Sequence, residues 1–313
     1  LDFATKHPAE FDTWTQLRKL GAAIQTTVGG RPFHPVNLHV GRLSSYPDST
    51  KLAPILTGLK AHKEMAINLA NVVLTSTGET VSAQISNCTL QESKGYGLYL
   101  SPNATLGDFQ NNTVTKNGKG PVWAASEVVH MLPASSTYTG NDVDRITVAP
   151  NHVPQSVTWQ DLGLPYAMEG ALVVDKVLTI SPGVSMIMGK DSRVTVSTDE
   201  AGLSAIGTAA KPIVFTSDTK SAGSWQGLVF DNSKNSKNAL DYVTLEYGGT
   251  SSSSEYQGMI HAACDSHGLS LSVTNSTLQH SGKWAVYLCS YATFSESNNT
   301  YKDNALGDVL KDK

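Results

Sequence analysis

The chain is poor in charge and in aromatic side chains, and each shortage excludes a class of protein. Only 16% of its 313 residues are charged and 7% are aromatic, and the formal net charge is −4. Such a chain lacks the basic surface that nucleic acids require, so no nucleic-acid partner is expected. It also lacks the richness in Ala, Glu, Lys, Leu and Arg that long helices and coiled coils show.

Long apolar runs and metal-binding motifs are also missing. No run of about 18 apolar residues occurs, so no membrane-spanning helix is expected. The three cysteines form no CxxC and the nine histidines form no HExxH. We therefore expect neither a disulfide scaffold nor a zinc site, and no cofactor.

Uncharged polar residues and turn formers are abundant instead. The chain has 34 Ser, 30 Thr and 17 Asn, together with 26 Gly and 13 Pro. Residues of these types favour short strands joined by many turns. The composition therefore predicts an all-β protein.

An internal repeat specifies the architecture. Residues 85–106 and 273–294 are identical at nine of 22 positions, and residues 111–122 and 298–309 at six of 12. Within each copy an Asn-x-Thr turn recurs after 24 or 23 residues, at Asn87 and Asn111 and at Asn275 and Asn298. A period in the low twenties, with short strands of alternating polarity, predicts a β-solenoid whose equivalent residues stack from coil to coil.

The segment at 177–249 carries a resemblance to a known family. It contains LTISPGV, GLSAIGTAAKPIVFTS, SWQGLVF and ALDYVTLEYGG, and it resembles the bacterial right-handed parallel β-helix repeat proteins, many of them secreted proteins or lipoproteins. The resemblance covers 133–313 well, 85–132 through the repeat, and 1–84 poorly. It implies a right-handed parallel β-helix and a secreted or outer-surface location in a bacterium. The family has no agreed activity, so the resemblance implies no function.

Two related modules are predicted, at 1–132 and 133–313. The second begins with a Pro-rich junction at 133–170, and the first with a capping segment at about 1–35. Within that segment an amphipathic helix over 8–20 is expected to cover the first coil, because Phe11, Trp14, Leu17 and Leu20 recur at helical spacing. One continuous solenoid and two β-helices at an angle both fit the sequence.

Two further expectations concern packing. Gly207 and Gly227 suit bends where successive coils approach closely. Trp225, just before the second of these glycines, is interpreted as a packing residue.

Polysaccharide lyases and hydrolases often use this fold, so candidate catalytic groups matter. Asp231, Glu246, His261 and Asp265 are the candidates for acid, base or nucleophile. Within the two aligned stretches the repeat copies share no carboxylate and no histidine, since Glu92 corresponds to His280 and Lys94 to Gly282, and between the stretches Asp108 corresponds to Glu296. What the copies share is the Asn, Thr, Leu, Gln and Tyr of turns and cores. This favours a protein without catalytic activity.

Outward aromatic residues make carbohydrate binding the leading prediction. The candidates that could stack on sugar rings are Tyr99, Tyr247, Tyr256, Trp284 and Tyr287. Tyr99 and Tyr287 are equivalent in the repeat and alternate with inward Leu, so both are expected to point outward. The leading interpretation is a secreted or cell-surface structural and adhesive protein that binds an extracellular polysaccharide or surface glycan. The alternatives are a polysaccharide lyase or glycoside hydrolase, and a passive spacer.

The cysteines and some acidic residues allow further predictions. Cys264 and Cys289 are about one coil apart and are candidates for a disulfide, although stacking of Ile260 on Val286 would put the sulfurs one position out of register. Cys88 is predicted to be a lone buried thiol. Asp108, Asp142 and Asp144 are weak calcium candidates, since no EF-hand or Gly/Asp nonapeptide supports them, and turn-capping roles are favoured.

Overall fold

The computed structural model describes residues 85–250 and 256–313 without a break. Before residue 85 it describes residues 12, 15, 16, 18–20, 22, 38, 39, 42, 43, 55, 57, 82 and 83. The chain divides into two compact units, Leu1–Gly78 and Glu79–Lys313.

In the first unit, the described positions between residues 12 and 22 are helical, in agreement with the helix predicted there. The predicted capping contact and most of the apolar face of that helix lie outside the described residues. β1 (Leu38–His39) and β2 (Arg42–Leu43) pair antiparallel. No helix in the described part of the chain is long and apolar enough to cross a membrane.

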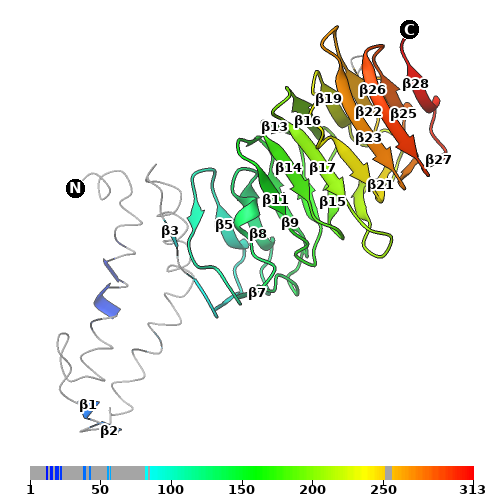
Figure 1. The fold of residues 1–313 in the computed structure, drawn as a ribbon. Helices are drawn as coiled ribbons and strands as arrows, with labels where there is room; N and C mark the ends of the chain where they lie inside the picture. The colour runs from blue at the N-terminus through cyan, green and yellow to red at the C-terminus, as the bar shows by residue number, and fades with distance from the viewer. Residues whose placement is uncertain are drawn as a thin grey trace. The chain divides into compact units, whose positions relative to one another are not determined.

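Three sheets of parallel strands form most of the second unit (Figure 1). The seven-stranded sheet contains β10 (His152–Val153), β13 (Ala171–Val174), β16 (Arg193–Ser197), β19 (Gly227–Asp231), β22 (Gly258–Ala263), β25 (Trp284–Leu288) and β28 (Gly307–Lys311). The six-stranded sheet contains β11 (Val157–Trp159), β14 (Val177–Ile180), β17 (Gly202–Ile206), β20 (Ala239–Asp241), β23 (Leu269–Thr274) and β26 (Ala292–Ser297). The nine-stranded sheet contains β5 (Tyr96–Leu100), β8 (Gly120–Ala125), β9 (Ile146–Ala149), β12 (Tyr166–Met168), β15 (Ser185–Met188), β18 (Ile213–Thr216), β21 (Val243–Glu246), β24 (Thr277–Gln279) and β27 (Thr300–Lys302).

Shorter elements complete the first coils. β3 (Ser82–Ala83) pairs with β6 (Thr105–Leu106), and β4 (Thr89–Gln91) pairs with β7 (Thr113–Thr115). A single 3-10 turn, η1 (Val129–Met131), follows β8.

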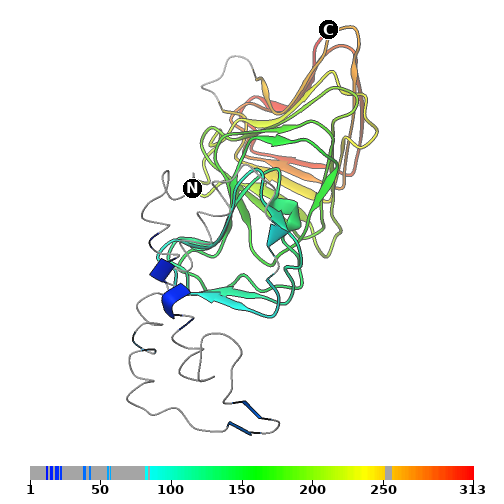
Figure 2. The same cartoon turned by 90° about the vertical axis from the view of Figure 1, so that its left-hand side faces the viewer.

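The chain visits the three large sheets in a fixed order. After β10, β11 and β12 it returns to place β13 beside β10, β14 beside β11 and β15 beside β12. Parallel strands joined by such crossovers are right-handed almost without exception. The fold is therefore the predicted right-handed parallel β-helix, whose successive coils lie one behind another in Figure 2.

Alternation along each strand builds that core. β14 and β15 each show two buried positions separated by a half-buried one, as strands with one inward face must. Buried residues from all three sheets form one continuous hydrophobic cluster. Trp225 is fully buried and its Nε1 donates to the Glu246 carbonyl oxygen at 2.9 Å, which confirms its predicted packing role.

The two glycines predicted at close approaches are confirmed. A Cβ on Gly227, whose φ is +132°, would lie 2.3 Å from the Met259 carbonyl oxygen. A Cβ on Gly207 would lie 2.8 Å from the Tyr242 carbonyl oxygen. Both contacts are closer than a side chain tolerates, so the adjacent coils approach there only because these residues are glycine.

Asparagines hold the corners between coils. Asn117 Oδ1 accepts from the Ser93 amide at 3.0 Å, and Asn141 Oδ1 accepts from the Asn117 amide at 3.0 Å. In the second copy Asn299 and Asn304 accept from the Ser276 and Ser281 amides. Each asparagine thus satisfies a backbone amide of the preceding coil that a corner would otherwise leave unpaired.

The junction predicted at 133 lies inside the second unit. β8 precedes it and β9 follows it, and the two strands pair directly, with Val122 opposite Ile146. The coils therefore continue through residues 133–170. Of the two arrangements that the sequence allowed, the described residues form one continuous solenoid.

Candidate functional site

One outward-facing row runs the length of the nine-stranded sheet. The register places one residue from each strand in this row: Tyr99, Trp123, Thr147, Ala167, Ile187, Thr216, Glu246, Gln279 and Lys302. Its first two members are aromatic, its middle members are small or apolar, and its last three are long and polar. The row therefore offers different chemistry at its two ends and a low floor between them.

Tyr99 and Trp123 form a stacked pair at the first end of the row. Their ring centroids are 4.1 Å apart and the ring planes differ by 3°. Tyr99 thus covers one face of the indole and fixes its orientation. The other face is turned toward the next coil, where Thr147 is the neighbour in register.

A groove of about 530 Å³ lies beside Trp123, which is one of its lining residues. Its floor includes Thr147, Ala167 and Ile187, which are half-buried outward residues of β9, β12 and β15. Trp123 and Ile187 are three strands apart, which is roughly 14 Å at the usual spacing. The volume lies within the range of ordinary ligand sites.

Charged groups frame the groove on its rim. Arg145 Nη1 donates to Asp218 Oδ2 at 2.7 Å, and the two residues are 73 positions apart in the chain. This ion pair ties the segment after β18 to the start of β9, across the coils that contain β12 and β15. Glu169, an exposed residue directly after β12, also lines the groove.

The far end of the row is closed by hydrogen bonds. Glu246 accepts from Thr216 Oγ1 and from Gln279 Nε2, both at 2.7 Å. Both carboxylate oxygens of this predicted catalytic residue therefore have side-chain partners on neighbouring strands. Glu246 is placed as a structural link within the sheet.

The other predicted aromatic residues lie away from the groove. Tyr247 stacks on His280, with centroids 5.2 Å apart. Trp284 packs so closely over Gly307 that a Cβ there would lie 2.6 Å from its ring. Of the five predicted aromatic residues, only Tyr99 reaches the groove, through Trp123.

Tyr256 and Tyr287 flank His261 on the seven-stranded sheet. His261 is buried, stacks on Tyr287 at 5.2 Å and meets the edge of Tyr256 at 5.4 Å. The Tyr287 hydroxyl donates to Asp312 at 2.6 Å, which raises the pKa of the phenol. His261, one of the predicted catalytic candidates, is thus buried between two aromatic rings.

Asp231 and Asp265 are the predicted catalytic residues that the structure brings together. Partial burial, and then the negative charge of Asp265, raise the pKa of Asp231 above its ordinary value. Asn232 links the pair, since its Nδ2 donates to Asp231 and its Oδ1 accepts from the Asp265 amide. The pair lies at the corner between the seven- and six-stranded sheets, whereas the groove is on the nine-stranded sheet.

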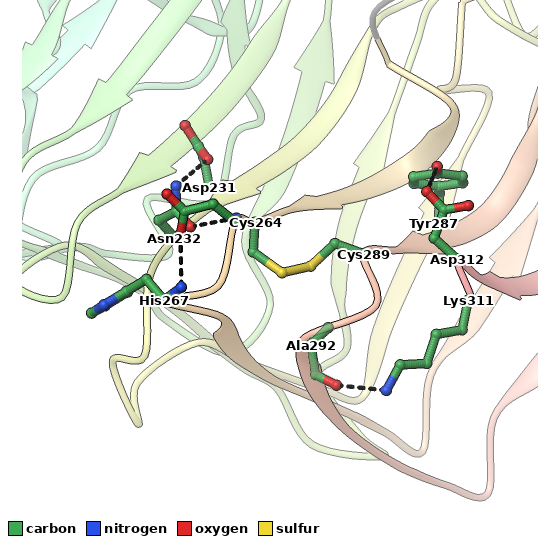
Figure 3. The surroundings of a disulfide bond; sticks show 10 residues. Asp231, Asn232, Cys264, His267, Tyr287, Cys289, Ala292, Lys311 and Asp312 are labelled. Carbon is green, nitrogen blue, oxygen red and sulfur yellow. Dashed lines mark hydrogen bonds between the residues drawn. A yellow bond between two sulfur atoms is a disulfide. The ribbon is translucent and has the colours of Figure 1, made fainter.

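A disulfide joins Cys264 and Cys289 at the same corner (Figure 3). Their Cα atoms are 5.7 Å apart, within the range that a disulfide needs. Ile260 pairs with Val286, so Cys264 and Cys289 are offset by one position in the register, as anticipated from the sequence. The bond forms because both cysteines lie just beyond their strands. Cys88 is a free thiol, as predicted, but the prediction that it is buried is wrong, because the residue is exposed.

Among the weak calcium candidates, Asp144 serves to stabilise a turn. Asp144 accepts from the backbone amides of Gly140 and Asn141 at 2.9 and 2.8 Å. Slight burial alone would raise the pKa of Asp144, but these hydrogen bonds lower it. Within the described ranges, no group of three or more His, Cys, Asp or Glu is arranged to hold a metal ion.

Sequence reasoning missed most of the residues that form the groove. Trp123, Arg145, Glu169 and Asp218 were not among the candidates. Trp123 could have been found, since it follows Tyr99 by the same 24 residues that separate Asn87 from Asn111. No local signal connects Arg145 with Asp218.

The comparison with family models gave one match. Residues 152–262 match the model of the pectate-lyase like beta helix domain. This segment covers β10 to most of β22 and contains part of the groove. The comparisons with curated proteins and with solved structures gave no match.

Proposed function

We propose that this chain, whose residues 152–262 match a pectate-lyase like beta helix domain, is a non-enzymatic carbohydrate-binding protein. Its role is structural or adhesive, its location is the secreted space or the outer cell surface, and its partner is an extracellular polysaccharide. The observation that carries the proposal is the half-buried Trp123, which stacks on Tyr99 and lines the end of the groove.

The indole face suits the apolar face of a sugar ring. Stacking against an aromatic ring adds to the area that is buried, and it loses least entropy when the ring is already fixed. Tyr99 fixes the Trp123 ring in advance at 4.1 Å. When one sugar unit of an oligosaccharide stacks on this ring, the following units lie over Thr147 and the next coils along the helix axis.

The rim supplies polar groups for the sugar hydroxyls. Charged side chains make the stronger hydrogen bonds, and Arg145, Asp218 and Glu169 all line the groove. Thr147 adds a hydroxyl on the floor. An apolar platform with a few convergent polar groups is the ordinary composition of a ligand site.

The same rim favours binding over cleavage. Hydrolysis of a glycosidic bond needs two carboxyl groups that flank it, one as acid and one as base or nucleophile. Of the two groove carboxylates, Asp218 is engaged by Arg145 at 2.7 Å. Glu169 is then the one carboxylate free for a ligand among the described groove residues.

A second candidate function rests on Asp231 and Asp265. A carboxyl with a raised pKa beside another carboxylate is the arrangement that acid catalysis uses. A polysaccharide hydrolase or lyase at this corner would release sugar products, and Asp231→Asn and Asp265→Asn would each abolish their release. Unchanged release in both variants would exclude this corner as the active site.

Retention on immobilised polysaccharides tests the binding proposal. Hydroxyethylcellulose, xyloglucan, galactomannan, polygalacturonate and alginate are coupled to beads at equal sugar density. Trp123→Ala should weaken retention on the polymer that binds best by about tenfold, the value of one good aromatic contact. Tyr291→Ala is the matched control, because Tyr291 is 60% exposed and does not line the groove.

A second variant keeps the binding proposal testable if Trp123→Ala fails to fold. Thr147→Arg leaves the tryptophan in place but puts a large side chain on the half-buried floor of the groove. It should abolish retention while the thermal unfolding midpoint stays near that of the parent. Retention that both groove variants leave intact would place the site elsewhere, and absence of retention on every polymer would favour the passive spacer.

A further inference from the structure

The charges of the groove point to the class of glycan that it takes. Among the described residues that line it, Arg145 is the cation and Glu169 and Asp218 are the anions. Arg145 donates to Asp218 at 2.7 Å, so its charge is already compensated. Lys190 and Lys220 are close in sequence to lining residues, but neither lines the groove.

Glu169 leaves a carboxylate facing the ligand. Its side chain is exposed and makes no hydrogen bond or ion pair with the described residues. Gly189 directly follows β15 and lies beside Glu169 of the preceding coil. A Cβ on Gly189 would lie 3.0 Å from the Glu169 side chain. The glycine thus leaves room for the Cβ and Cγ atoms of Glu169 beside the groove.

We infer that the groove takes an uncharged glycan and excludes polyuronates; this inference rests on the proposed function. Neutral sugars offer hydroxyl donors, which form strong hydrogen bonds to a carboxylate. A polyuronate carries a carboxylate on each sugar unit and would bring one close to Glu169, and the described residues that line the groove include no unpaired cation to offset the repulsion. The acidic groove therefore discriminates by charge, and the discrimination weakens as salt screens it.

The bead panel tests this inference through a ratio. At low salt the parent should be retained more strongly on at least one neutral polymer than on polygalacturonate or alginate. Glu169→Gln should raise the ratio of polygalacturonate retention to neutral-polymer retention by about three- to fivefold, the size of one like-charge contact in water-like surroundings. Asp308→Asn is the matched control for net charge, because Asp308 is an exposed carboxylate on β28; it should leave the ratio unchanged.

The outcomes separate the two proposals. Retention on polygalacturonate or alginate that equals or exceeds retention on every neutral polymer, and that Trp123→Ala abolishes, would overturn the inference and leave the binding function standing. A ratio that Glu169→Gln and Asp308→Asn raise equally would also overturn it, because net charge alone would then explain the exclusion. Failure of every polymer to retain the parent would overturn both.

Discussion

Single asparagines stabilise this β-helix because the corners between its strands leave backbone amides without partners. The side chain of Asn117 is fully buried and makes three hydrogen bonds at its corner. It accepts from the Ser93 backbone amide and donates to the Leu90 carbonyl oxygen and to Asn141 Oδ1. Asn304 makes the equivalent contacts to Ser281 and Leu278 in the second copy. The repeat therefore preserves residues that close corners.

Asn117→Ala should lower the free energy of unfolding by about 2–3 kcal/mol, because it leaves a buried amide and a carbonyl without their side-chain partner. Denaturant unfolding measures the change. Asn103→Ala is the matched control, since Asn103 is exposed in a turn, and it should change stability by less than about 0.5 kcal/mol. Equal losses in the two variants would contradict the corner role.

Asp231→Asn should make the protein more stable at neutral pH. Burial, and then the charge of Asp265, raise the pKa of Asp231 in the folded state above 3.8. The folded state therefore holds the proton more tightly, so this group's stabilisation is complete below pH 3.8 and is lost as the pH rises through the folded value. The gain at neutral pH should be at most about 1 kcal/mol after solvent screening.

Denaturant unfolding at a series of pH values checks the sign of this effect. The difference between Asp231→Asn and the parent should shrink as the pH falls toward 3.8, the ordinary value for the carboxyl. A difference that is constant with pH, or that grows in acid, would show that the Asp231 carboxylate is not destabilised in the fold.

At the scale of elements, the two repeat copies occupy different faces of the helix. β4 and β24 have the same sequence, TLQ, yet β24 belongs to the nine-stranded sheet and β4 pairs only with β7. β5 is in the nine-stranded sheet, whereas its sequence counterpart β25 is in the seven-stranded sheet. Strand alternation and corner asparagines determine how each coil turns its corners. They do not determine to which of the three sheets a given strand belongs.

The disulfide should stabilise the last coils specifically. It joins the corner after β22 to the corner after β25 and closes a segment of 25 residues. Loss of a bond that closes a loop of this size typically costs about 2–4 kcal/mol. Cys264→Ser with Cys289→Ser, made in a Cys88→Ser background to remove the exposed thiol, should lower the unfolding free energy by that amount.

Hydrogen exchange locates this effect along the solenoid. Because each coil contacts only its neighbours, exchange should accelerate in β25 and β28 and stay unchanged in β13 and β16. Equal acceleration in all four strands would mean that the coils unfold as one unit, and the local role of the bond would be wrong.

At the scale of the whole molecule, the sequence could predict the fold but little of the groove. Strand alternation and the coil period can be read from short stretches of sequence. The β-helix, the close approaches of the coils at Gly207 and Gly227, and the pairing of Cys264 with Cys289 could therefore be predicted. The groove depends on coil length: register partners are 20 residues apart at Thr147 and Ala167 but 33 apart at Glu246 and Gln279. The long loops of the later coils bring Asp218 back to Arg145, and no local pattern reveals that return.

The predicted catalytic set failed for a related reason. Asp231 ends β19 and Asp265 comes shortly after the neighbouring strand β22, so their proximity could be predicted from the coil period. Glu246 lies on a different sheet, and rings enclose His261 on the outer face of β22. Sequence proximity placed these residues in nearby coils but could not say on which side of the coil each lies.

The most direct test of the central claim measures retention and sugar release on the same beads. The parent is incubated with each immobilised polymer, and bound protein, reducing ends and the ultraviolet absorbance of unsaturated products are followed together. The account predicts retention on a neutral polymer, dependent on Trp123, with no release of sugar above the Thr147→Arg variant. Release of reducing ends or unsaturated products that requires Asp231 and Asp265 would contradict it and identify the chain as an enzyme.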